Sequence, residues 1–145
     1  NRIKMGHFMR QGRICILTSG RHAGKKGIIV HTHESRANRK FPHAIVAGID
    51  RYPKKVTKRM GVKKIARKSH LKPFVKAVNY THLLPTRYVV KDFDFENIND
   101  AALAEKESKT AARKQLRTLF EGKYMQPQKD DKGDNVKFFF KKLRF

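Results

Sequence analysis

Five short apolar segments in the first part of the chain constrain its fold more than any other feature. They are rich in β-branched residues, and the connections between them carry glycine, proline, asparagine and serine, which is typical of strands joined by turns. Several short strands of this kind favour a small antiparallel barrel or sandwich. The five segments are Arg13–Thr18, Gly27–His33, His43–Ile49, Phe74–Tyr80 and Thr86–Val90.

The last third of the chain has strong helix formers, from Asn99 to Tyr124. Asn99 or Asp100 can cap a helix there, and Gly122 can end it. A narrow apolar stripe indicates that this helix docks by one edge. The stripe comprises Ala112, Leu116, Leu119 and Phe120. The sequence therefore predicts a mainly β fold with an α-helical appendage.

Two further segments follow the predicted helix. Residues 126–135 are polar and are interpreted as a linker, whereas residues 136–145, VKFFFKKLRF, are apolar and basic together. A tail of this composition would be poorly protected from water on an isolated domain. We therefore expect it to pack on the barrel or on a partner.

The formal net charge of +23 is concentrated in one part of the chain. Residues 1–91 hold 23 Lys and Arg against 2 carboxylates, a net of +21, whereas residues 92–145 hold 12 against 10, a net of +2. A chain that neutralises phosphates gains from such a charge, because each contact releases a condensed counterion. An anionic membrane surface is another possible partner. However, the sequence has no run of about 18 apolar residues and no signal-peptide pattern, so we expect no membrane insertion.

Residue types that carry catalysis or hold metals are sparse. Cys15 is the only cysteine, which excludes internal disulfides and a cysteine-built zinc site and fits a reducing, intracellular compartment. Before residue 92 the only carboxylates are Glu34 and Asp50, so a paired-carboxylate site in the barrel is not expected. His31 and His33 alternate on one strand without an evident third metal ligand, and they are interpreted as surface or RNA-facing residues. We predict no enzymatic activity, cofactor, metal site or small-molecule substrate.

The segment SGRHAGKKGIIV, residues 19–30, has the glycines and lysines of a phosphate-binding loop. A P-loop needs four residues between its glycines, a hydroxyl after its lysine and a helix after that. Here Gly20 and Gly24 enclose three residues, and a strand-like run follows. A turn between two strands, made possible by Gly20, Gly24 and Gly27, explains the segment better. Its charges can be those of a solvated hairpin, but the strongly basic context favours phosphate contact. The candidates, expected to project from the tip, are Arg21, His22, Lys25 and Lys26.

Residues 51–72 form a basic insertion between the third and fourth predicted strands, with ten Lys and Arg and no acid. Pro53 and Gly61 discourage one continuous helix. A charge run is usually a disordered or solvated segment. This one is tethered by strands at both ends, so we expect an arm that becomes ordered against RNA. Tyr52 can stack on an unpaired base. The candidate RNA contacts are Arg51, Tyr52, Lys54, Lys55, Lys58, Arg59, Lys63, Lys64, Arg67, Lys68 and Lys72.

The stretch GRICILTSGRHAGKKGIIV resembles the KOW motif, found in small SH3-like barrels of ribosomal proteins and transcription elongation factors. Three further stretches, HAIVAGIDRYPKKVTKRMGVKKIARKS, VNYTHLLPTRY and FFFKKLRF, are similar to a family of eukaryotic large-subunit ribosomal proteins, the twenty-seventh of the eukaryote-type series. The resemblance implies a KOW barrel with basic extensions that binds large-subunit ribosomal RNA and neighbouring ribosomal proteins. It also implies that the hairpin and the insertion supply the RNA contacts and that the protein is not an enzyme.

A domain organisation and a function follow from these expectations. Residues 1–5 are predicted to be an N-terminal extension, residues 6–92 an SH3-like barrel that includes the insertion 51–72, and residues 93–145 a helical region with a basic and aromatic tail. The resemblance implies a structural constituent of the cytosolic ribosome, assembled in the nucleolus, that stabilises folded ribosomal RNA. A KOW-type transcription elongation module and a DNA-packaging protein are the alternatives.

Overall fold

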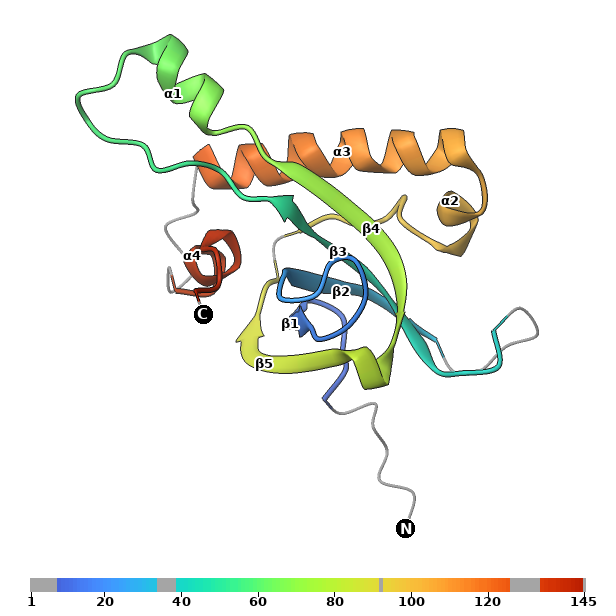
Figure 1. The fold of residues 1–145 in the computed structure, drawn as a ribbon. Coiled ribbons are helices and arrows are strands. Elements are labelled where there is room, and N and C mark those ends of the chain that lie inside the picture. The colour runs from blue at the N-terminus through green and yellow to red at the C-terminus, as the bar shows by residue number, and fades with distance from the viewer. Residues whose placement is uncertain (1–7, 34–38, 92, 126–133, 145) are drawn as a thin grey trace.

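The computed structural model describes residues 8–33, 39–91, 93–125 and 134–144. Its centre is a five-stranded sheet of order β4-β3-β2-β1-β5, with antiparallel neighbours throughout. The edge strands β4 and β5 are joined directly by the short 3-10 helix η2 (Tyr80–His82), so the sheet must curl to bring its edges together there (Figure 1). This mainly β, barrel-like fold confirms the predicted fold class. The strands are β1 (Arg13–Leu17), β2 (Lys26–His33), β3 (His43–Arg51), β4 (Lys72–Asn79) and β5 (Leu83–Val89).

Two apolar clusters occupy opposite faces of the sheet, because successive side chains of a strand point in opposite directions. Ile28 and Ile45 belong to the larger cluster, whereas their neighbours Ile29 and Val46 belong to the smaller one. Side chains of α3 (Lys106–Met125) and α4 (Asp134–Phe140) complete the larger cluster, so these helices cover that face. Burial of both faces explains why the strands read as nearly continuous apolar runs.

All five predicted strands are present, and β5 differs most from its expected range. It begins at Leu83 rather than Thr86, because Leu83 pairs with Leu17 of β1. Pro85 within it pairs opposite Cys15. A proline cannot donate to a ladder of hydrogen bonds, but β5 is an edge strand, where this is tolerated.

The predicted single helix from Asn99 is divided into α2 (Asp100–Ala104) and α3. Asn99 is the N-cap, and its side chain accepts a hydrogen bond from the backbone N–H of Ala102 at 3.0 Å. Glu105 is extended, with φ −113° and ψ 149°, and interrupts the helix. The prediction that Gly122 ends the helix is wrong, because α3 continues to Met125. The predicted docking edge is confirmed, since Ala112, Leu116 and Phe120 are buried and Leu119 packs against the same cluster.

The tail packs on the barrel, as expected, through α4. Phe139 and Phe140 are buried in the larger cluster, and the Phe138 ring stacks on Tyr88 with centroids 4.2 Å apart. The Asn135 side chain donates to the carbonyl of Val89 at 3.0 Å. The predicted extension 1–5 and most of the linker 126–135 lie outside the described residues, and the domain boundaries stay predictions.

The β1–β2 hairpin turn uses its glycines as predicted. Gly20 and Gly24 have φ of 90° and 79°, in the left-handed region that favours glycine. The N–H of Gly24 donates to the carbonyl of Leu17 at 2.6 Å and closes the turn. A Cβ at Gly27 would lie 2.3 Å from a methyl of Val46, so this position requires glycine for close strand packing.

Candidate nucleic-acid interface

The basic arm, residues 52–71, leaves the sheet between β3 and β4 and projects from the body of the molecule (Figure 1). Its first half is extended and includes Pro53, and its second half is the short helix α1 (Val62–Lys68), which begins directly after Gly61. The two halves meet at the base, where the N–H of Lys54 donates to the carbonyl of Lys68 at 2.8 Å. The prediction that no continuous helix spans the insertion is confirmed.

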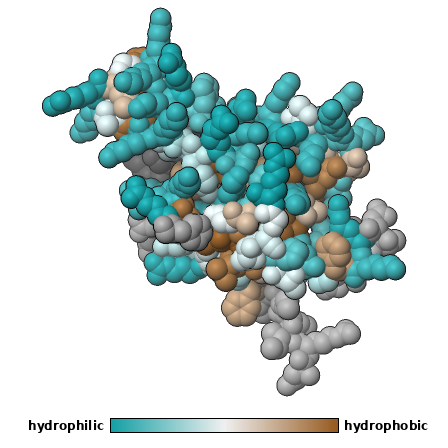
Figure 2. All heavy atoms as spheres, in the orientation of Figure 1, coloured by the Kyte–Doolittle hydropathy of each residue, from teal (hydrophilic) through white to brown (hydrophobic). Residues whose placement is uncertain are grey.

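The charges of the basic arm face solvent. No residue of α1 is buried, and Figure 2 shows hydrophilic side chains radiating from this end of the molecule. Among the described residues, no carboxylate forms an ion pair with any Lys or Arg between Lys54 and Lys68. Arg67 and Lys68 lie in the last turn of α1, where cations interact favourably with the helix dipole. The arm is therefore a concentrated positive charge that lacks an internal counter-charge.

The hairpin tip is joined to the base of the arm by one carboxylate. Asp50 forms ion pairs with the ammonium groups of Lys25 and Lys72, the latter at 3.4 Å, and its Oδ1 lies 3.4 Å from Nδ1 of His22. The imidazole of His22 stacks on the Phe74 ring, with centroids 4.1 Å apart and planes 4° from parallel. Burial raises the pKa of Asp50, but the hydrogen bond and charge of Lys25, with His22 and Lys72, outweigh it and lower the pKa overall. Asp50 therefore stays ionised and holds hairpin and arm together.

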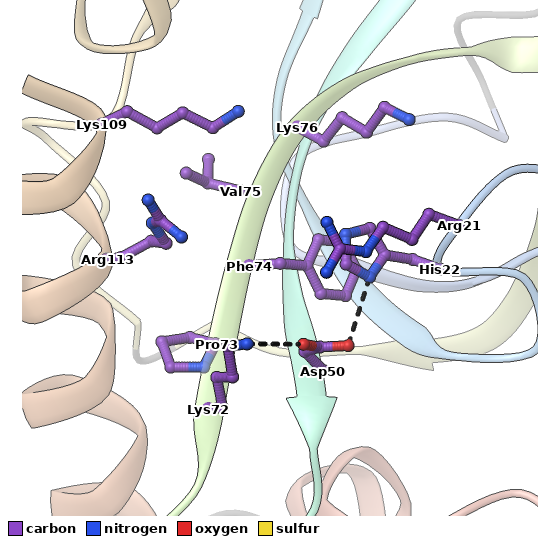
Figure 3. A pocket seen from close by; sticks show the side chains of 10 residues that line it. All are labelled: Arg21, His22, Asp50, Lys72, Pro73, Phe74, Val75, Lys76, Lys109 and Arg113. Carbon is purple, nitrogen blue, oxygen red and sulfur yellow. Dashed lines mark ion pairs between the residues drawn. The ribbon is translucent and has the colours of Figure 1, made fainter. Parts of the chain in front are cut away.

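A hollow of about 140 Å³ opens beside this ion-pair cluster (Figure 3). Its floor is the strand β4 around Phe74 and Val75, and its rim is positively charged on both sides. Asp50 is the only carboxylate among the residues that line it. We name this the basic hollow. Its basic residues are Arg21, His22, Lys72, Lys76, Lys109 and Arg113.

Protonation of His22 is disfavoured in the free protein. Burial lowers the pKa of His22, and the charges of Lys25, Lys76 and Arg21 lower it further, although Asp50 acts in the opposite direction. An anion in the basic hollow would reverse part of this effect, because a negative charge stabilises the imidazolium. The basic hollow is thus suited in size and charge to a phosphate group.

Three of the residues around the basic hollow were missed by sequence reasoning: Lys76, Lys109 and Arg113. Lys109 and Arg113 are one turn apart on α3, which places them on one face of the helix. They were not predicted because the last third of the chain carries nearly equal numbers of basic and acidic residues, so no basic segment stands out there. Their i, i+4 spacing beside the apolar stripe was the available signal, since a helix that docks by Ala112 and Leu116 must carry its adjacent residues close to the sheet.

The prediction that Lys26 projects from the hairpin tip is wrong. Its side chain is 2% exposed, and its ammonium donates to the carbonyls of Phe138 at 2.7 Å and Lys141 at 2.6 Å. It also lies 3.7 Å from the centroid of the Phe138 ring. Burial, with the charge of Lys141, lowers the pKa of Lys26 to about 8. The cause is strand alternation: Lys26 begins β2, so its side chain points away from that of Lys25.

Tyr52 is also placed differently from expectation. Its ring packs against the larger apolar cluster, and its hydroxyl accepts a hydrogen bond from the backbone N–H of Lys26 at 2.9 Å. Burial raises the pKa of this hydroxyl. Tyr52 therefore anchors the base of the arm and is not presented as a stacking surface. The other basic residues predicted in the hairpin and insertion are exposed or partly exposed.

A curled antiparallel sheet with a basic arm and a basic hollow defines a strongly basic, mainly β protein. The chain belongs to the ribosomal L27e protein family, whose family model matches residues 14–145. It is 47% identical over 143 residues to a protein of Caenorhabditis elegans and 44% identical over 143 residues to one of Candida albicans. It is 45% identical over 144 residues to a protein of Tetrahymena thermophila. Each alignment covers 97% of this chain and 100% of the relative, and each relative is named large ribosomal subunit protein eL27. The predicted family is confirmed.

None of the helices among the described residues is both long enough and apolar enough to cross a bilayer.

Proposed function

We propose that this chain is a structural constituent of the large subunit of the cytosolic ribosome, where it binds folded ribosomal RNA and is not an enzyme. Family membership and the names of the relatives support the ribosomal assignment. The observation that carries RNA binding is the basic arm, whose Lys and Arg side chains lack ion-pair partners among the described residues. A charge concentrated in this way is costly unless a polyanion neutralises it.

Two surfaces share the proposed RNA contact. The basic arm lies against the phosphate backbone and releases counterions, which supplies most of the electrostatic free energy of binding. The basic hollow takes one phosphate between α3 and the hairpin tip and thereby fixes the orientation of the barrel. Phosphate contacts of this kind position a protein without reading base sequence. The fold of the RNA, rather than its sequence, therefore determines where the protein binds.

Neighbouring large-subunit proteins are the second class of partner that we propose. The protein would join the large subunit while that subunit is assembled in the nucleolus. The alternative function is a KOW-type module of a transcription elongation factor. The family match over residues 14–145 favours the ribosomal role, since the matched family is a ribosomal one.

Sedimentation of cell lysate on a gradient, with the protein followed across fractions, tests this proposal. We expect the protein in stoichiometric amount with large subunits and with translating ribosomes. Recovery mainly with polymerase or chromatin after removal of ribosomes would contradict the ribosomal role and favour the alternatives.

A further inference from the structure

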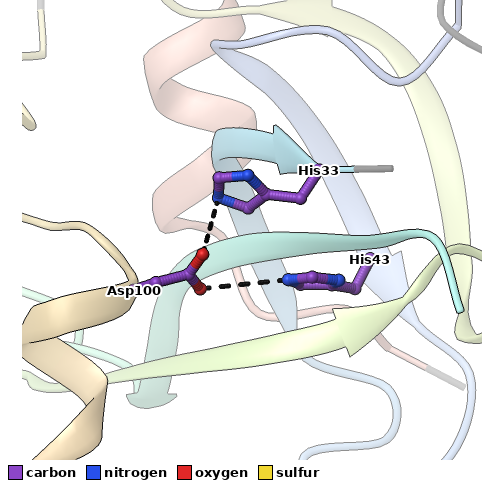
Figure 4. A group of neighbouring side chains, drawn as sticks. All are labelled: His33, His43 and Asp100. Atoms are coloured by element: carbon purple, nitrogen blue, oxygen red, sulfur yellow. Dashed lines mark ion pairs between the residues drawn. The ribbon is translucent and has the colours of Figure 1, made fainter. Parts of the chain in front are cut away.

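The end of the β2–β3 hairpin holds a cluster of three potential metal ligands from three elements (Figure 4). His33 is the last residue of β2 and His43 the first residue of β3, and the two are direct partners across the antiparallel pair. Asp100 is the first residue of α2 and points at both imidazoles. The sequence offered no third ligand beside His31 and His33. The fold instead brings His43 and Asp100 to His33.

The distances within the cluster suit one small cation. Nε2 of His33 lies 3.2 Å from Oδ2 of Asp100, and Nε2 of His43 lies 3.9 Å from Oδ1. The three ligand atoms all lie within 4.8 Å of one another. Tetrahedral zinc with bonds of about 2.0–2.2 Å needs ligand atoms roughly 3.3–3.6 Å apart. A modest contraction, through rotation of the Asp100 side chain and small shifts of the imidazoles, would close this gap.

The surroundings of His43 favour a cation rather than an empty cluster. His43 is 2% exposed, and its Nδ1 lies 3.3 Å from the carbonyl of Phe41. When Nδ1 donates to that carbonyl, the neutral ring directs the lone pair of Nε2 at the Asp100 carboxylate. Within the described residues, Nε2 of His43 has no hydrogen-bond partner. A lone pair and a carboxylate face one another favourably only with a proton or a metal cation between them, and an imidazole whose other nitrogen donates to a backbone carbonyl is the arrangement usual for metal-ligating histidine.

One neighbouring group competes for the site. The guanidinium of Arg39 lies 3.5 Å from Oδ1 of Asp100, and its side chain is 38% exposed. A metal ion must displace it from that oxygen. Because Arg39 is partly exposed and bonded there by a single long contact, its displacement costs little, as is usual for surface ion pairs.

We propose that His33, His43 and Asp100 bind one Zn²⁺ ion, with water as the fourth ligand. Two histidines, one carboxylate and a water suit tetrahedral zinc. Because its ligands come from three elements, the ion ties α2, and with it the start of the helical region, to the β2–β3 pair. Binding to the folded chain alone stabilises it by mass action.

Zinc titration of the untagged, metal-free full-length chain tests this proposal. We expect one Zn²⁺ per chain by calorimetry, a higher melting temperature with zinc, and the intense visible absorption of tetrahedral Co²⁺ when cobalt replaces it. His33→Gln and Asp100→Asn should each weaken zinc binding by more than about tenfold and abolish the rise in melting temperature. Both positions are accessible, with side chains 15% and 37% exposed, and Asn99 still caps α2 in the second variant.

Matched controls separate this site from adventitious binding. His31→Gln removes the neighbouring histidine of β2, whose ring centroid lies 6.3 Å from that of His33, and His70→Gln removes an exposed histidine elsewhere. Both should leave zinc affinity unchanged, and Arg39→Gln should maintain or raise it. Equal affinity in His33→Gln, an equal loss in His31→Gln, or no binding by the wild type would each overturn the proposal. The cobalt spectrum of the wild type tests for a tetrahedral site even if a variant folds poorly.

Discussion

At the scale of single residues, Lys26 illustrates how strand alternation assigns a role. Lys25 and Lys26 are adjacent, yet one pairs with Asp50 near the surface and the other is buried against α4. The Lys26 ammonium satisfies carbonyls at the end of α4, where the helix dipole is negative. The same residue thus connects the start of β2 with the tail of the chain.

Replacement of this lysine by methionine should destabilise the protein. Lys26→Met leaves the carbonyls of Phe138 and Lys141 without a donor, which costs about 1–3 kcal/mol of unfolding free energy. Urea unfolding at neutral pH measures this cost. The exposed substitution Lys114→Met serves as the control and should change stability little.

The pH dependence of the same comparison has a definite sign. The pKa of Lys26 is about 8 in the folded chain and 10.5 ordinarily, so between these values the unfolded chain binds more protons. Unfolding free energy therefore rises with pH across that interval. The neutral amine still has two hydrogens for the two carbonyls. We expect the stability difference between wild type and Lys26→Met to widen from pH 8 upward, and a constant or narrowing difference would contradict this assignment.

His22 should make RNA binding depend on pH. The pKa of His22 is lowered in the free protein, so the neutral ring contributes fully to the free energy of unfolding above the ordinary pKa of 6.5. This contribution is lost as the pH falls below 6.5. A phosphate in the basic hollow favours the protonated form, so affinity for structured ribosomal RNA should increase as pH falls below the ordinary imidazole pKa of 6.5. Binding isotherms at several pH values measure this. His22→Gln should flatten the increase, whereas His82→Gln, at an exposed histidine of η2, should not.

At the scale of elements, the basic arm is held by specific contacts at its base, whereas the rest of the arm has few stabilising contacts. Helix α1 has seven residues and none of them is buried. Isolated helices shorter than about 12–15 residues are marginal in water. The folded arm seen here therefore depends on its attachment at Tyr52 and on the Lys54–Lys68 backbone hydrogen bond.

Hydrogen exchange should reveal this difference between arm and sheet. We expect amides of residues 58–68 to exchange rapidly in the free protein and to become protected on ribosomal RNA, because contact with phosphates orders the segment. Peptides from β3 and β4 provide the internal reference and should be protected in both states. Strong protection of the arm in the free protein would show that it is already rigid.

At the scale of the whole molecule, the charge distribution predicts how binding responds to salt. If about eight basic groups meet phosphates, the slope of log K against log salt concentration should be roughly −6 to −7. Titrations of structured large-subunit RNA between about 50 and 200 mM salt measure it. A slope near −1 or −2 would contradict binding through the arm.

The contribution of the basic hollow to that slope can be separated. The double variant Lys109→Gln, Arg113→Gln removes two of its cations and should reduce the slope by about 1–2. Lys114→Gln, Arg117→Gln removes two exposed charges of the same helix outside the basic hollow. This control should leave the slope nearly unchanged. Equal effects of both pairs would show that the charges of α3 act nonspecifically and would contradict a phosphate site in the basic hollow.

The strands were predictable from sequence because their composition follows from burial on both faces of the sheet. The N-cap at Asn99 was predictable because capping is a local interaction. The break at Glu105 was not, since it depends on how α2 and α3 dock. The basic hollow was not predicted for a similar reason: the i, i+4 spacing of Lys109 and Arg113 indicates a shared helix face, but their distance from β4 is set only when α3 has packed.

The place of α4 in the larger cluster has a consequence for synthesis. Phe139 and Phe140 pack in the same cluster as Ile14, although more than a hundred residues separate them in sequence. In a chain made from its N-terminus at about 5–20 residues per second, α3 is available first, but the part of this face that Phe139 and Phe140 cover stays open until α4 emerges. Products truncated before α4 would expose it permanently. The packing of Phe139 and Phe140 thus couples the finished core of the sheet to the synthesis of α4.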